Sequence, residues 1–323
     1  MASLHQKGCN LDETLFFSLL SLILVAFFYY ILNRHFNVSH TQLGPLQIEE
    51  PANEPLYIFA LGDSGSGDEN QYAVAAAMEE RCQQLAHLDG LLLLGDLFYM
   101  EGISSTEDKQ WEEKIEKPYG SACLSKANIY PIFGNHDYRG NKEAFIEYGK
   151  SHSRWKIPNR FYSLNFSNLA KFISIDSNFL DLCFDPETCV IDFLKQELND
   201  KAHKWKIVLS HYPLASASMK GYHHNGDAVF GTIAKGLACG NADLWISGHA
   251  HHLEHRRMKN CSTDLLVSGG GGGDLEDIRH DEPEMKFGAS SFGFLELEIS
   301  QNSVIARFHN KNSHMIFEKE IRK

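Results

Sequence analysis

The sequence lacks an excess of basic residues, and it lacks internal repeats. It holds 30 Lys and Arg against 42 Asp and Glu, which gives a formal net charge of −12 at pH 7. Nucleic-acid-binding proteins attract the phosphate backbone with basic patches, so this charge balance argues against a nucleic-acid partner. The absence of a repeating unit of about 20 to 50 residues argues against a solenoid or a propeller. An anionic substrate would have to be attracted locally, and bound metal ions are suited to this.

What is present is the composition of an ordinary globular protein. Of the 323 residues, 43% are hydrophobic and 22% are charged, which provides enough apolar material for a sizeable core. The length would allow one large domain or two average ones. We expect one large domain.

One uncharged run is long enough to cross a bilayer. Residues 15–32 carry no charge and are mostly Leu, Phe, Ile and Val, and about 20 apolar residues span a bilayer core. We predict an uncleaved transmembrane anchor rather than a signal peptide, because Asp12 and Glu13 precede the run and no small-residue cleavage site follows it. The membrane is then a partner through this helix. Charge leaves its orientation open, since Lys7 and Arg34 lie on opposite sides.

Cysteines and glycosylation sequons indicate on which side of the membrane the large domain lies. Seven cysteines, six of them after the anchor, are compatible with disulfides on the oxidising side of a membrane. We expect Cys183 and Cys189 to bridge; the alternative is that all six are buried small hydrophobic side chains. Asn37, Asn165 and Asn260 each begin an Asn-x-Ser sequon. Together these features predict a single-pass membrane protein whose large domain is luminal, periplasmic or extracellular.

The chain divides into four predicted parts. An N-terminal tail (1–14) precedes the anchor (15–32). A polar, proline-containing stretch without periodicity forms a stalk (33–54). The folded domain is expected at 55–323.

Within this domain, short apolar runs alternate with helix-like segments. Each run ends in a polar loop, which is typical of a buried strand, and the alternating order predicts an α/β sandwich. Strands are expected at Leu56–Leu61, Gly90–Leu94, Ile129–Phe133, Lys206–Leu209 and Ala242–Ile246, helices at Tyr72–Leu88 and Cys189–Asn199, and β-rich C-terminal segments at Phe292–Ile299, Val304–Phe308 and Met315–Lys319.

Five consecutive glycines, Gly269–Gly273, would let backbone amides approach an anion closely. No Lys-Ser or Lys-Thr follows them, as a nucleotide-binding phosphate loop requires. We therefore expect a flexible surface turn between two strands.

Five strand ends carry residue types that bind metals. Singly, each motif is unremarkable, because Gly-Asp pairs commonly make turns. Loops at the carboxyl ends of strands gather at one crevice, so the five together predict a metal site at one edge of a sheet. In chain order the motifs are Gly62-Asp63, Gly95-Asp96-Leu97-Phe98-Tyr99, Gly134-Asn135-His136-Asp137, His211-Tyr212-Pro213 and Gly248-His249-Ala250-His251.

In these motifs the sequence resembles the calcineurin-like metallophosphoesterases, and within them the purple acid phosphatases, most closely the small tartrate-resistant type. The resemblance covers about residues 55 to 310 and includes the neighbouring segments 134–141 and 153–158. Tyr99, three positions after Asp96, discriminates between the groups. Most calcineurin-like phosphoesterases have another residue there, whereas purple acid phosphatases use this tyrosine as an iron ligand. The resemblance implies a two-sheet β-sandwich flanked by helices.

The resemblance also implies the ligands of a dinuclear metal centre. Phenolate and carboxylate are hard anionic donors suited to Fe(III), whereas imidazole and amide suit a divalent Fe, Zn or Mn ion. One metal would be held by Asp63, Asp96, Tyr99 and His251, and the other by Asp96, Asn135, His211 and His249, with Asp96 as the bridge.

The implied chemistry is hydrolysis of a phosphate ester without a covalent enzyme intermediate. Two ions about 3.5–4 Å apart bind phosphate, lower the pKa of a bound water and stabilise charge on the attacking and leaving oxygens. His136 would stabilise the pentacoordinate phosphorus or protonate the leaving alcohol. Asp137 would either orient that imidazole or cap the loop.

Three positions depart from the family pattern. Ser64 stands where Trp is common, and this replacement is expected to widen or re-polarise the rim of the site without affecting the metal ligands. Lys220 stands where small family members have an active-site His. His223 or His224 would substitute for that His, or Lys220 would bind phosphate as a cation; a merely solvated loop is the alternative. Ala250 replaces an Asp inside the last His-x-His motif, which is expected to affect metal affinity. The candidate substrate-binding residues are Asn135, Lys220, His223 and His224.

We predict an acid phosphatase of broad specificity that hydrolyses phosphate monoesters by attack of metal-activated water or hydroxide. A phosphodiesterase on the same dimetal core is the alternative enzyme, and hydrolysis of a diester without a monoester would favour it. A membrane-anchored binding or signalling protein with a vestigial site is a further alternative. The seven competent ligand residues argue against it, and lack of turnover by fully metal-loaded protein would favour it.

Overall fold

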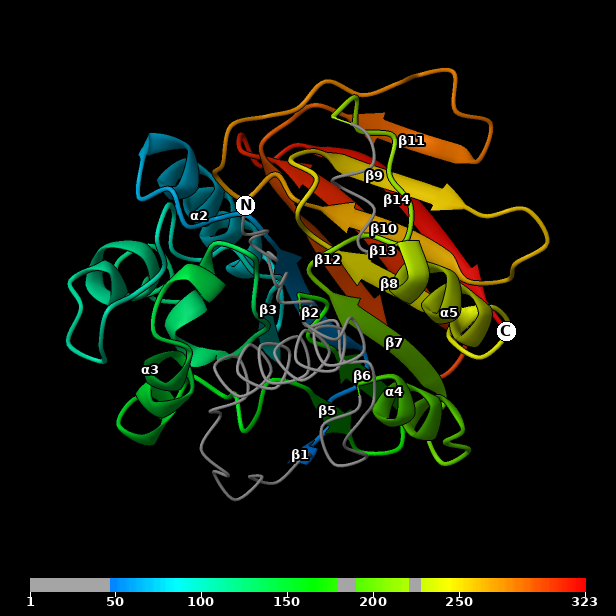
Figure 1. Ribbon diagram of the computed structural model, residues 1–323, viewed down its shortest axis with the longest axis horizontal. Helices are drawn as coiled ribbons and strands as arrows, with labels where there is room; N and C mark the ends of the chain where they lie inside the picture. The colour runs from blue at the N-terminus through cyan, green and yellow to red at the C-terminus, as the bar shows by residue number, and fades with distance from the viewer. Residues whose placement is uncertain (1–46, 179–189, 221–227) are drawn as a thin grey trace, which may run out of the picture. The chain divides into compact units, whose positions relative to one another are not determined.

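A computed structural model describes residues 47–178, 190–220 and 228–323, with the backbone alone described at 228–230 (Figure 1). The predicted tail and transmembrane anchor lie outside these residues. Among the helices that the structure describes, none is long and apolar enough to cross a membrane.

Two β-sheets form the domain, which confirms the expected two-sheet α/β sandwich (Figure 1). The eight-stranded sheet has the order β1-β5-β6-β7-β8-β10-β9-β11, and the six-stranded sheet has the order β14-β13-β12-β2-β3-β4. The strands are β1 Gln47–Glu50, β2 Leu56–Leu61, β3 Gly90–Leu93, β4 Asn128–Pro131, β5 Tyr162–Phe166, β6 Ala170–Ser174, β7 Trp205–Ser210, β8 Leu244–Ser247, β9 Leu253–Arg257, β10 Asp264–Ser268, β11 Met285–Ala289, β12 Gly293–Ile299, β13 Ser303–Asn310 and β14 Met315–Arg322.

Each sheet contains parallel strands whose carboxyl ends carry the predicted ligands. In the six-stranded sheet β2, β3 and β4 are parallel neighbours. In the eight-stranded sheet β6, β7, β8 and β10 are parallel neighbours. The ligand-bearing loops follow β2, β3, β4, β7 and β8. Both sheets therefore build the site, whereas the sequence predicts one sheet edge.

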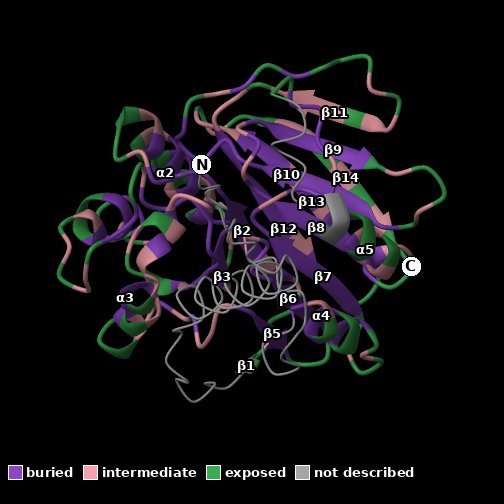
Figure 2. Cartoon of the chain, in the orientation of Figure 1, coloured by how far each residue is buried: buried purple, intermediate pink, exposed green. Residues whose placement is uncertain are grey.

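The central strands are buried along their whole length, as the uniform colour of β7, β8 and β10 shows (Figure 2). A strand covered on both faces needs apolar side chains on both, so such strands form continuous apolar runs in the sequence. In β7, Ile207 and Leu209 join a core cluster that includes residues of both sheets. Val208 between them joins a second cluster with residues of α4 (Val190–Leu198) and α5 (Ala228–Ala238).

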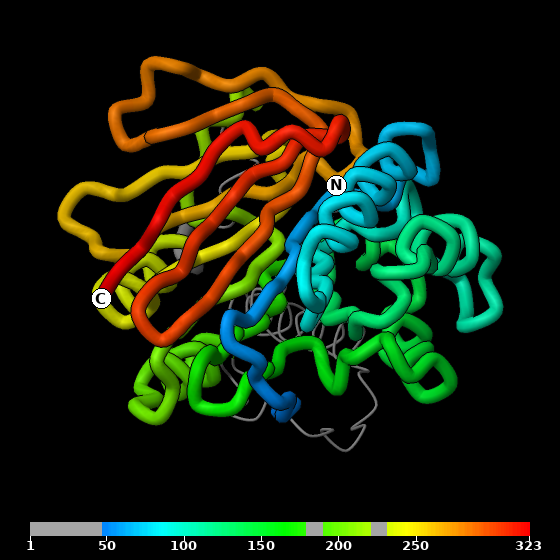
Figure 3. Tube along the Cα trace, turned by 180° about the vertical axis from the view of Figure 1, so that it is seen from behind, coloured from blue at the N-terminus to red at the C-terminus, as the bar shows by residue number. Residues whose placement is uncertain are grey.

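A longer helix, α2 (Glu69–Cys82), packs on β12 and β13 of the six-stranded sheet. Figure 3 shows β12, β13 and β14 side by side from behind. Helix α2 begins after Asp68, whose carboxylate accepts hydrogen bonds from the backbone N–H groups of Asn70 and Gln71. The short helical segments are α3 Lys142–Glu147, η1 Glu112–Glu116, η2 Leu124–Lys126, η3 Asp137–Arg139 and η4 Tyr148–Lys150.

Strand β1 corrects the predicted boundary of the domain. It pairs in parallel with β5. The carboxylate of Glu50 accepts a hydrogen bond from the hydroxyl of Tyr130 at 2.8 Å, and that of Glu49 accepts one from the amide of Asn165 at 2.6 Å. The end of the predicted stalk (33–54) is therefore part of a sheet rather than a linker.

Two disulfides join described cysteines. Cys82 bridges to Cys123 with their Cα atoms 6.0 Å apart, and Cys239 bridges to Cys261 at 5.1 Å. The alternative in which all cysteines after the anchor are unpaired is therefore wrong. The predicted 183–189 bridge lies outside the described residues and stays a prediction.

Candidate metal centre

Three predicted ligands adopt a left-handed backbone conformation. The φ angle is +59° at Asp63, +54° at Asp96 and +66° at His249. Residues other than glycine rarely adopt this conformation, and when they do they cluster at functional sites. Neighbouring glycines make room for these loops: a Cβ at Gly134 would lie 2.1 Å from the backbone nitrogen of Asp96 and 2.2 Å from its Oδ1. The loops are therefore built for close approach at the cost of local strain.

Asp63, Tyr99 and His251 meet on one side of the site. The hydroxyl of Tyr99 lies 3.0 Å from Nε2 of His251 and 3.3 Å from Oδ1 of Asp63. Nε2 of His251 lies 3.4 Å from the same carboxylate oxygen. The carbonyl of Asp274 accepts a hydrogen bond from Nδ1 of His251 at 2.7 Å. This contact keeps the proton on Nδ1, so that Nε2 faces the other two side chains.

The remaining four predicted ligands meet beside this group. Nε2 of His211 lies 3.4 Å from Oδ2 of Asp96 and 3.1 Å from Oδ1 of Asn135. It also lies 3.1 Å from Nδ1 of His249. One ligand atom each of Asp96, His211 and His249 lies within 4.8 Å of the others. A single metal ion would fit among these atoms.

The group around Tyr99 and the group around His211 are joined by a hydrogen bond. The backbone N–H of His249 donates a hydrogen bond to Oδ2 of Asp63 at 2.6 Å. Asp96 also acts on the other group, because its charge helps to raise the pKa of Tyr99. All seven predicted ligand side chains are therefore brought together in one cluster.

The charges of this cluster favour bound cations. Burial lowers the pKa of His211, but Asp96 outweighs it and raises that pKa to about 9. Asp63 likewise outweighs burial and raises the pKa of His251 to about 9. Buried carboxylates that hold protons on the neighbouring imidazoles make a site with a strong preference for positive charge. Metal ions would supply this charge in place of the protons.

His136 lies at the edge of the cluster. Its Nδ1 donates a hydrogen bond to the carbonyl of Met100 at 2.8 Å. Its ring meets the ring of Tyr99 edge-on, with 4.6 Å between centroids. Nε2 lies 4.0 Å from Oδ2 of Asp96. The carbonyl fixes one proton on Nδ1, so Nε2 is the atom left to act in the site.

Asp137 clamps the ligand loops. Its carboxylate accepts hydrogen bonds from the backbone N–H groups of Asp96, Leu97 and Gly134 at 2.9, 2.9 and 2.8 Å. The imidazole of His136 is instead oriented by a backbone carbonyl. Of the two roles predicted for Asp137, the structure supports the loop cap.

The run Gly269–Gly273 is buried and packs against the ligand loops, so the predicted surface turn is wrong. The N–H of Gly273 donates to the carbonyl of Asp63 at 2.7 Å. A Cβ at Gly273 would lie 2.8 Å from the ring of His251. The glycines thus leave the space that this histidine occupies. The glycine run directly follows β10, which lies beside β8, and β8 is followed by a ligand-bearing loop. Five residues without side chains at that place are a signal of close packing against the site.

The positions that depart from the family pattern, and the remaining candidate substrate-binding residues, differ in their surroundings. Ser64 is fully buried. Nζ of Lys220 lies 2.9 Å from Oε1 of Glu276. Ala250 is fully buried between its two histidine neighbours. His223 and His224 lie outside the described residues.

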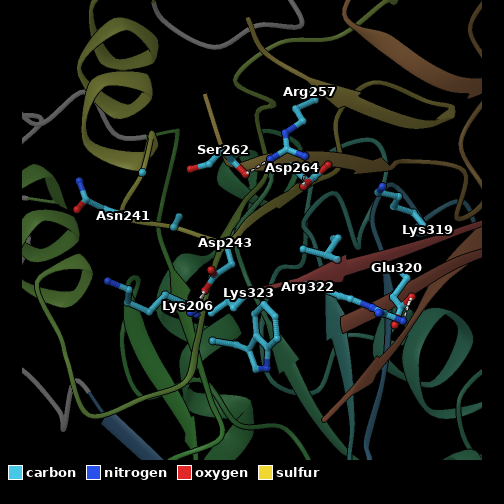
Figure 4. A pocket seen from close by; sticks show the side chains of 14 residues that line it. Lys206, Asn241, Asp243, Arg257, Ser262, Asp264, Lys319, Glu320, Arg322 and Lys323 are labelled. Atoms are coloured by element: carbon cyan, nitrogen blue, oxygen red, sulfur yellow. Dashed lines mark hydrogen bonds and ion pairs between the residues drawn. The ribbon is translucent and has the colours of Figure 1, made fainter. Parts of the chain in front are cut away.

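A cavity of about 470 Å³ lies elsewhere, between the starts of β7 and β8 and the end of β14 (Figure 4). None of the predicted ligands lines it. Its charges are largely paired: Asp243 lies 3.0 Å from Nζ of Lys323, and Glu320 lies 2.8 Å from Arg322. We assign this cavity no part in the chemistry.

Comparisons with known proteins agree with this geometry. The profile of the calcineurin-like phosphoesterase family matches residues 56–253. Purple acid phosphatase 3 of Arabidopsis thaliana is 27% identical over 86% of this chain and 81% of its own length. Human tartrate-resistant acid phosphatase type 5 is 27% identical over 69% of this chain and 75% of its own length.

Solved structures share the fold. GAP50, described as the anchor in the inner membrane complex of Plasmodium, superposes with a TM-score of 0.73 at 22% identity, over 84% of this chain and 89% of its own. A purple acid phosphatase from yellow lupin seeds superposes with a TM-score of 0.64 at 17% identity, over 84% and 55%. The family profile covers well over half of the chain and spans all seven clustered residues. The chain is therefore a member of the calcineurin-like phosphoesterase family, and its curated relatives are purple and tartrate-resistant acid phosphatases.

Proposed function

We propose that the protein is an acid phosphatase that hydrolyses phosphate monoesters at a dinuclear metal centre. The convergence of seven oxygen and nitrogen donors from five separate loops carries this proposal. The acid phosphatases among its relatives support it.

The donor set fits two different ions. Asp63 and Tyr99 offer hard anionic oxygens, which suit a trivalent iron. His211 and His249 offer imidazole nitrogens, which suit a divalent iron, zinc or manganese ion. Asp96 is close to His211 and also influences Tyr99. We propose Asp96 as the ligand shared by an Fe(III) and divalent pair, the role that the family resemblance implies.

When bound, the two ions would supply a polarised phosphate and a water of lowered pKa. The protein's own residues would orient the substrate and protonate the leaving alcohol. Nε2 of His136 is free of the backbone contact that holds Nδ1, and it can hold a proton for the leaving alcohol. Asp63, Asp96 and His211 are at most 1% exposed, and exclusion of water strengthens the attraction of the two carboxylates for bound cations. A monoester offers three unesterified oxygens to such a centre, whereas a diester offers two.

The test is to assay protein that holds two metals per chain with phenyl phosphate and diphenyl phosphate at mildly acidic pH. Faster hydrolysis of phenyl phosphate is the expected result. Preference for diphenyl phosphate would favour the phosphodiesterase alternative. Absence of turnover of both esters by fully loaded protein would favour a binding protein with a vestigial site.

We also propose a single-pass membrane protein with its catalytic domain on the extracytoplasmic side. Two disulfides support this proposal, because disulfides persist in oxidising compartments. The sequon at Asn260 is exposed, whereas Asn165 is 3% exposed and donates to Glu49. In a glycosylating secretory host we expect a glycan on Asn260 and none on Asn165. Loss of a glycosidase-sensitive mass in Asn260→Gln checks this, and an unmodified Asn260 would argue against the topology.

A further inference from the structure

Two loops beside the metal cluster are joined to each other. The loop 214–220 follows the His211 motif, and the loop 274–279 follows the glycine run. The backbone N–H of Met219 donates to the carbonyl of Asp277 at 2.9 Å. The second loop in turn orients His251 through its contact at Nδ1. The first loop is therefore held in a fixed position near a predicted metal ligand.

Glu276 is the buried carboxylate at this junction. It is 2% exposed. Its Oε2 accepts a hydrogen bond from the hydroxyl of Ser218 at 2.6 Å, and its Oε1 lies 2.9 Å from Nζ of Lys220. Its backbone N–H donates to the carbonyl of His251 at 3.0 Å. The ammonium group of Lys220 is thus linked to His251 through one residue.

Lys220 is the solvent-facing member of this network. Its side chain is 57% exposed, whereas the side chain of His251 is 16% exposed and that of Asp63 is fully buried. The reacting phosphate would lie at the buried cluster. An ammonium group outside that cluster can therefore bind only a part of the substrate that extends away from the phosphate. The chain carries a net charge of −12, and a cation held at this place is a local attraction for anions.

We propose that Lys220 is a specificity-determining residue that binds a second anionic group, carried by the alcohol portion of the substrate. This inference rests on the proposed function, because the reacting phosphate fixes where the substrate lies. Lysine acts as a compact point charge without a preferred planar geometry. A carboxylate or a further phosphate would therefore serve equally as the second group.

Two phosphonates of equal length test the proposal without turnover. 3-Phosphonopropionate carries a carboxylate where propylphosphonate carries a methyl group, and neither has an ester to cleave. Binding is measured by calorimetry to protein that holds two metals per chain. We expect Lys220→Met to weaken 3-phosphonopropionate about tenfold, the worth of one charge-assisted hydrogen bond, and to change propylphosphonate less than about twofold. Lys220→Arg should keep the preference.

A matched control is Lys150→Met. Lys150 also pairs with a glutamate, Glu147, at 3.0 Å, but on an exposed helical turn. We expect this variant to leave the binding of both phosphonates unchanged. Because Lys220→Met removes the ammonium partner of a buried carboxylate, the double variant Lys220→Met with Glu276→Gln is measured as well, with the same loss expected.

Equal weakening of both phosphonates would overturn the proposal, because Lys220 would then act on the reacting phosphate or on the metals. Unchanged binding of both would overturn it too. Selective loss of 3-phosphonopropionate in a protein that cleaves no ester would support the role of Lys220 and contradict the proposed phosphatase activity. Failure of the Lys220 proposal can therefore be told apart from failure of the proposed phosphatase activity.

Discussion

The phenol oxygen of Tyr99 lies 3.0 Å from Nε2 of His251, and both face Oδ1 of Asp63. Burial and the charges of Asp63 and Asp96 raise the pKa of Tyr99 well above its ordinary value. The phenol therefore keeps its proton unless a strong positive charge is bound beside it. A trivalent ion supplies more of that charge than a divalent one. Tyr99 is for this reason the residue that reports which metal is present.

We expect the purified protein to contain about one iron and one further transition metal per chain, the two-ion arrangement, and to be pink to violet. A phenolate bound to Fe(III) donates charge to the metal when it absorbs visible light, and the other proposed ligands give no such band. Tyr99→Phe should lose the colour even where iron is retained. Metal analysis and a visible spectrum check this. A colourless, fully active protein with only Mn(II) or Zn(II) would contradict the iron centre and leave six ligands for two divalent ions.

Asp96→Asn should abolish activity and weaken both metals, because Asp96 is the one residue proposed to contact both ions. The neutral amide removes a charge from a site where His211 holds the pKa of Asp96 at about 2, against the effect of burial. Metal content after dialysis and turnover are the measurements. Asp281→Asn, at an exposed position, is the control. Two tightly bound metals in the folded Asp96 variant would remove the bridging role.

His136→Ala should keep both metals while turnover falls about 10²- to 10⁴-fold, the usual contribution of a positioned acid or base. The loss should be smaller for nitrophenyl phosphate than for an alkyl phosphate, because a good leaving group needs less protonation. Rates with both substrates check this. Equal losses would argue that the imidazole stabilises the phosphorus centre instead of protonating the alcohol.

The loops of the metal site could be predicted from the sequence because each of them follows a strand. Such strands are local features: Leu56–Leu61 is predicted and observed with the same limits, and the apolar run of β7 is extended by one residue at each end. The individual ligands are assigned through the resemblance to the purple acid phosphatases. Strand ends alone do not show which loops meet, because the site draws on both sheets and not on one sheet edge.

Strand β9 shows why other parts could not be predicted. Its sequence, Leu253–Arg257, is mostly charged, yet four of its five residues are buried. Glu254 lies 2.5 Å from Arg256, and His255 lies 2.7 Å from Asp264 of β10. Charged residues can be buried when they are paired and hydrogen-bonded, and a hydropathy pattern does not reveal the partner across the sheet.

Two N-terminal deletions should show where the predicted stalk ends and the folded domain begins. Deletion of residues 1–46 removes no described strand and should yield soluble, active protein. Deletion of residues 1–50 also removes β1 and exposes the edge of β5, together with the groups that Glu49 and Glu50 satisfy. We expect this longer deletion to lower the midpoint of thermal unfolding by several degrees, which corresponds to about 1–2 kcal/mol. Equal midpoints for the two deletions would show that β1 contributes nothing to stability.

Two histidines make the stability of the protein without metals depend on pH. Asp96 raises the pKa of His211 to about 9, and Asp63 raises that of His251 to about 9, in both cases against burial. A group whose pKa is raised by folding stabilises the folded state fully below its unfolded pKa, and this stability is lost as pH rises through the folded pKa. Burial and Asp96 also raise the pKa of Asp137 to about 7. The stability that this carboxyl contributes in its protonated form is lost as pH rises from about 4, its unfolded pKa, to about 7, so most of that loss is complete before the histidines titrate.

We therefore expect the free energy of unfolding of chelator-treated protein to fall between about pH 7.5 and 9.5, by an amount on the order of 3 kcal/mol for the two histidines together. Urea unfolding at both pH values measures it. His211→Asn should remove about half of the fall, whereas His314→Asn, at an exposed position, should leave it unchanged. Protein loaded with metals should not show the fall, because bound metal has already displaced the imidazole protons. A stability that stays constant or rises over this range would contradict the opposed carboxylate and imidazole pairs on which the proposed metal centre depends.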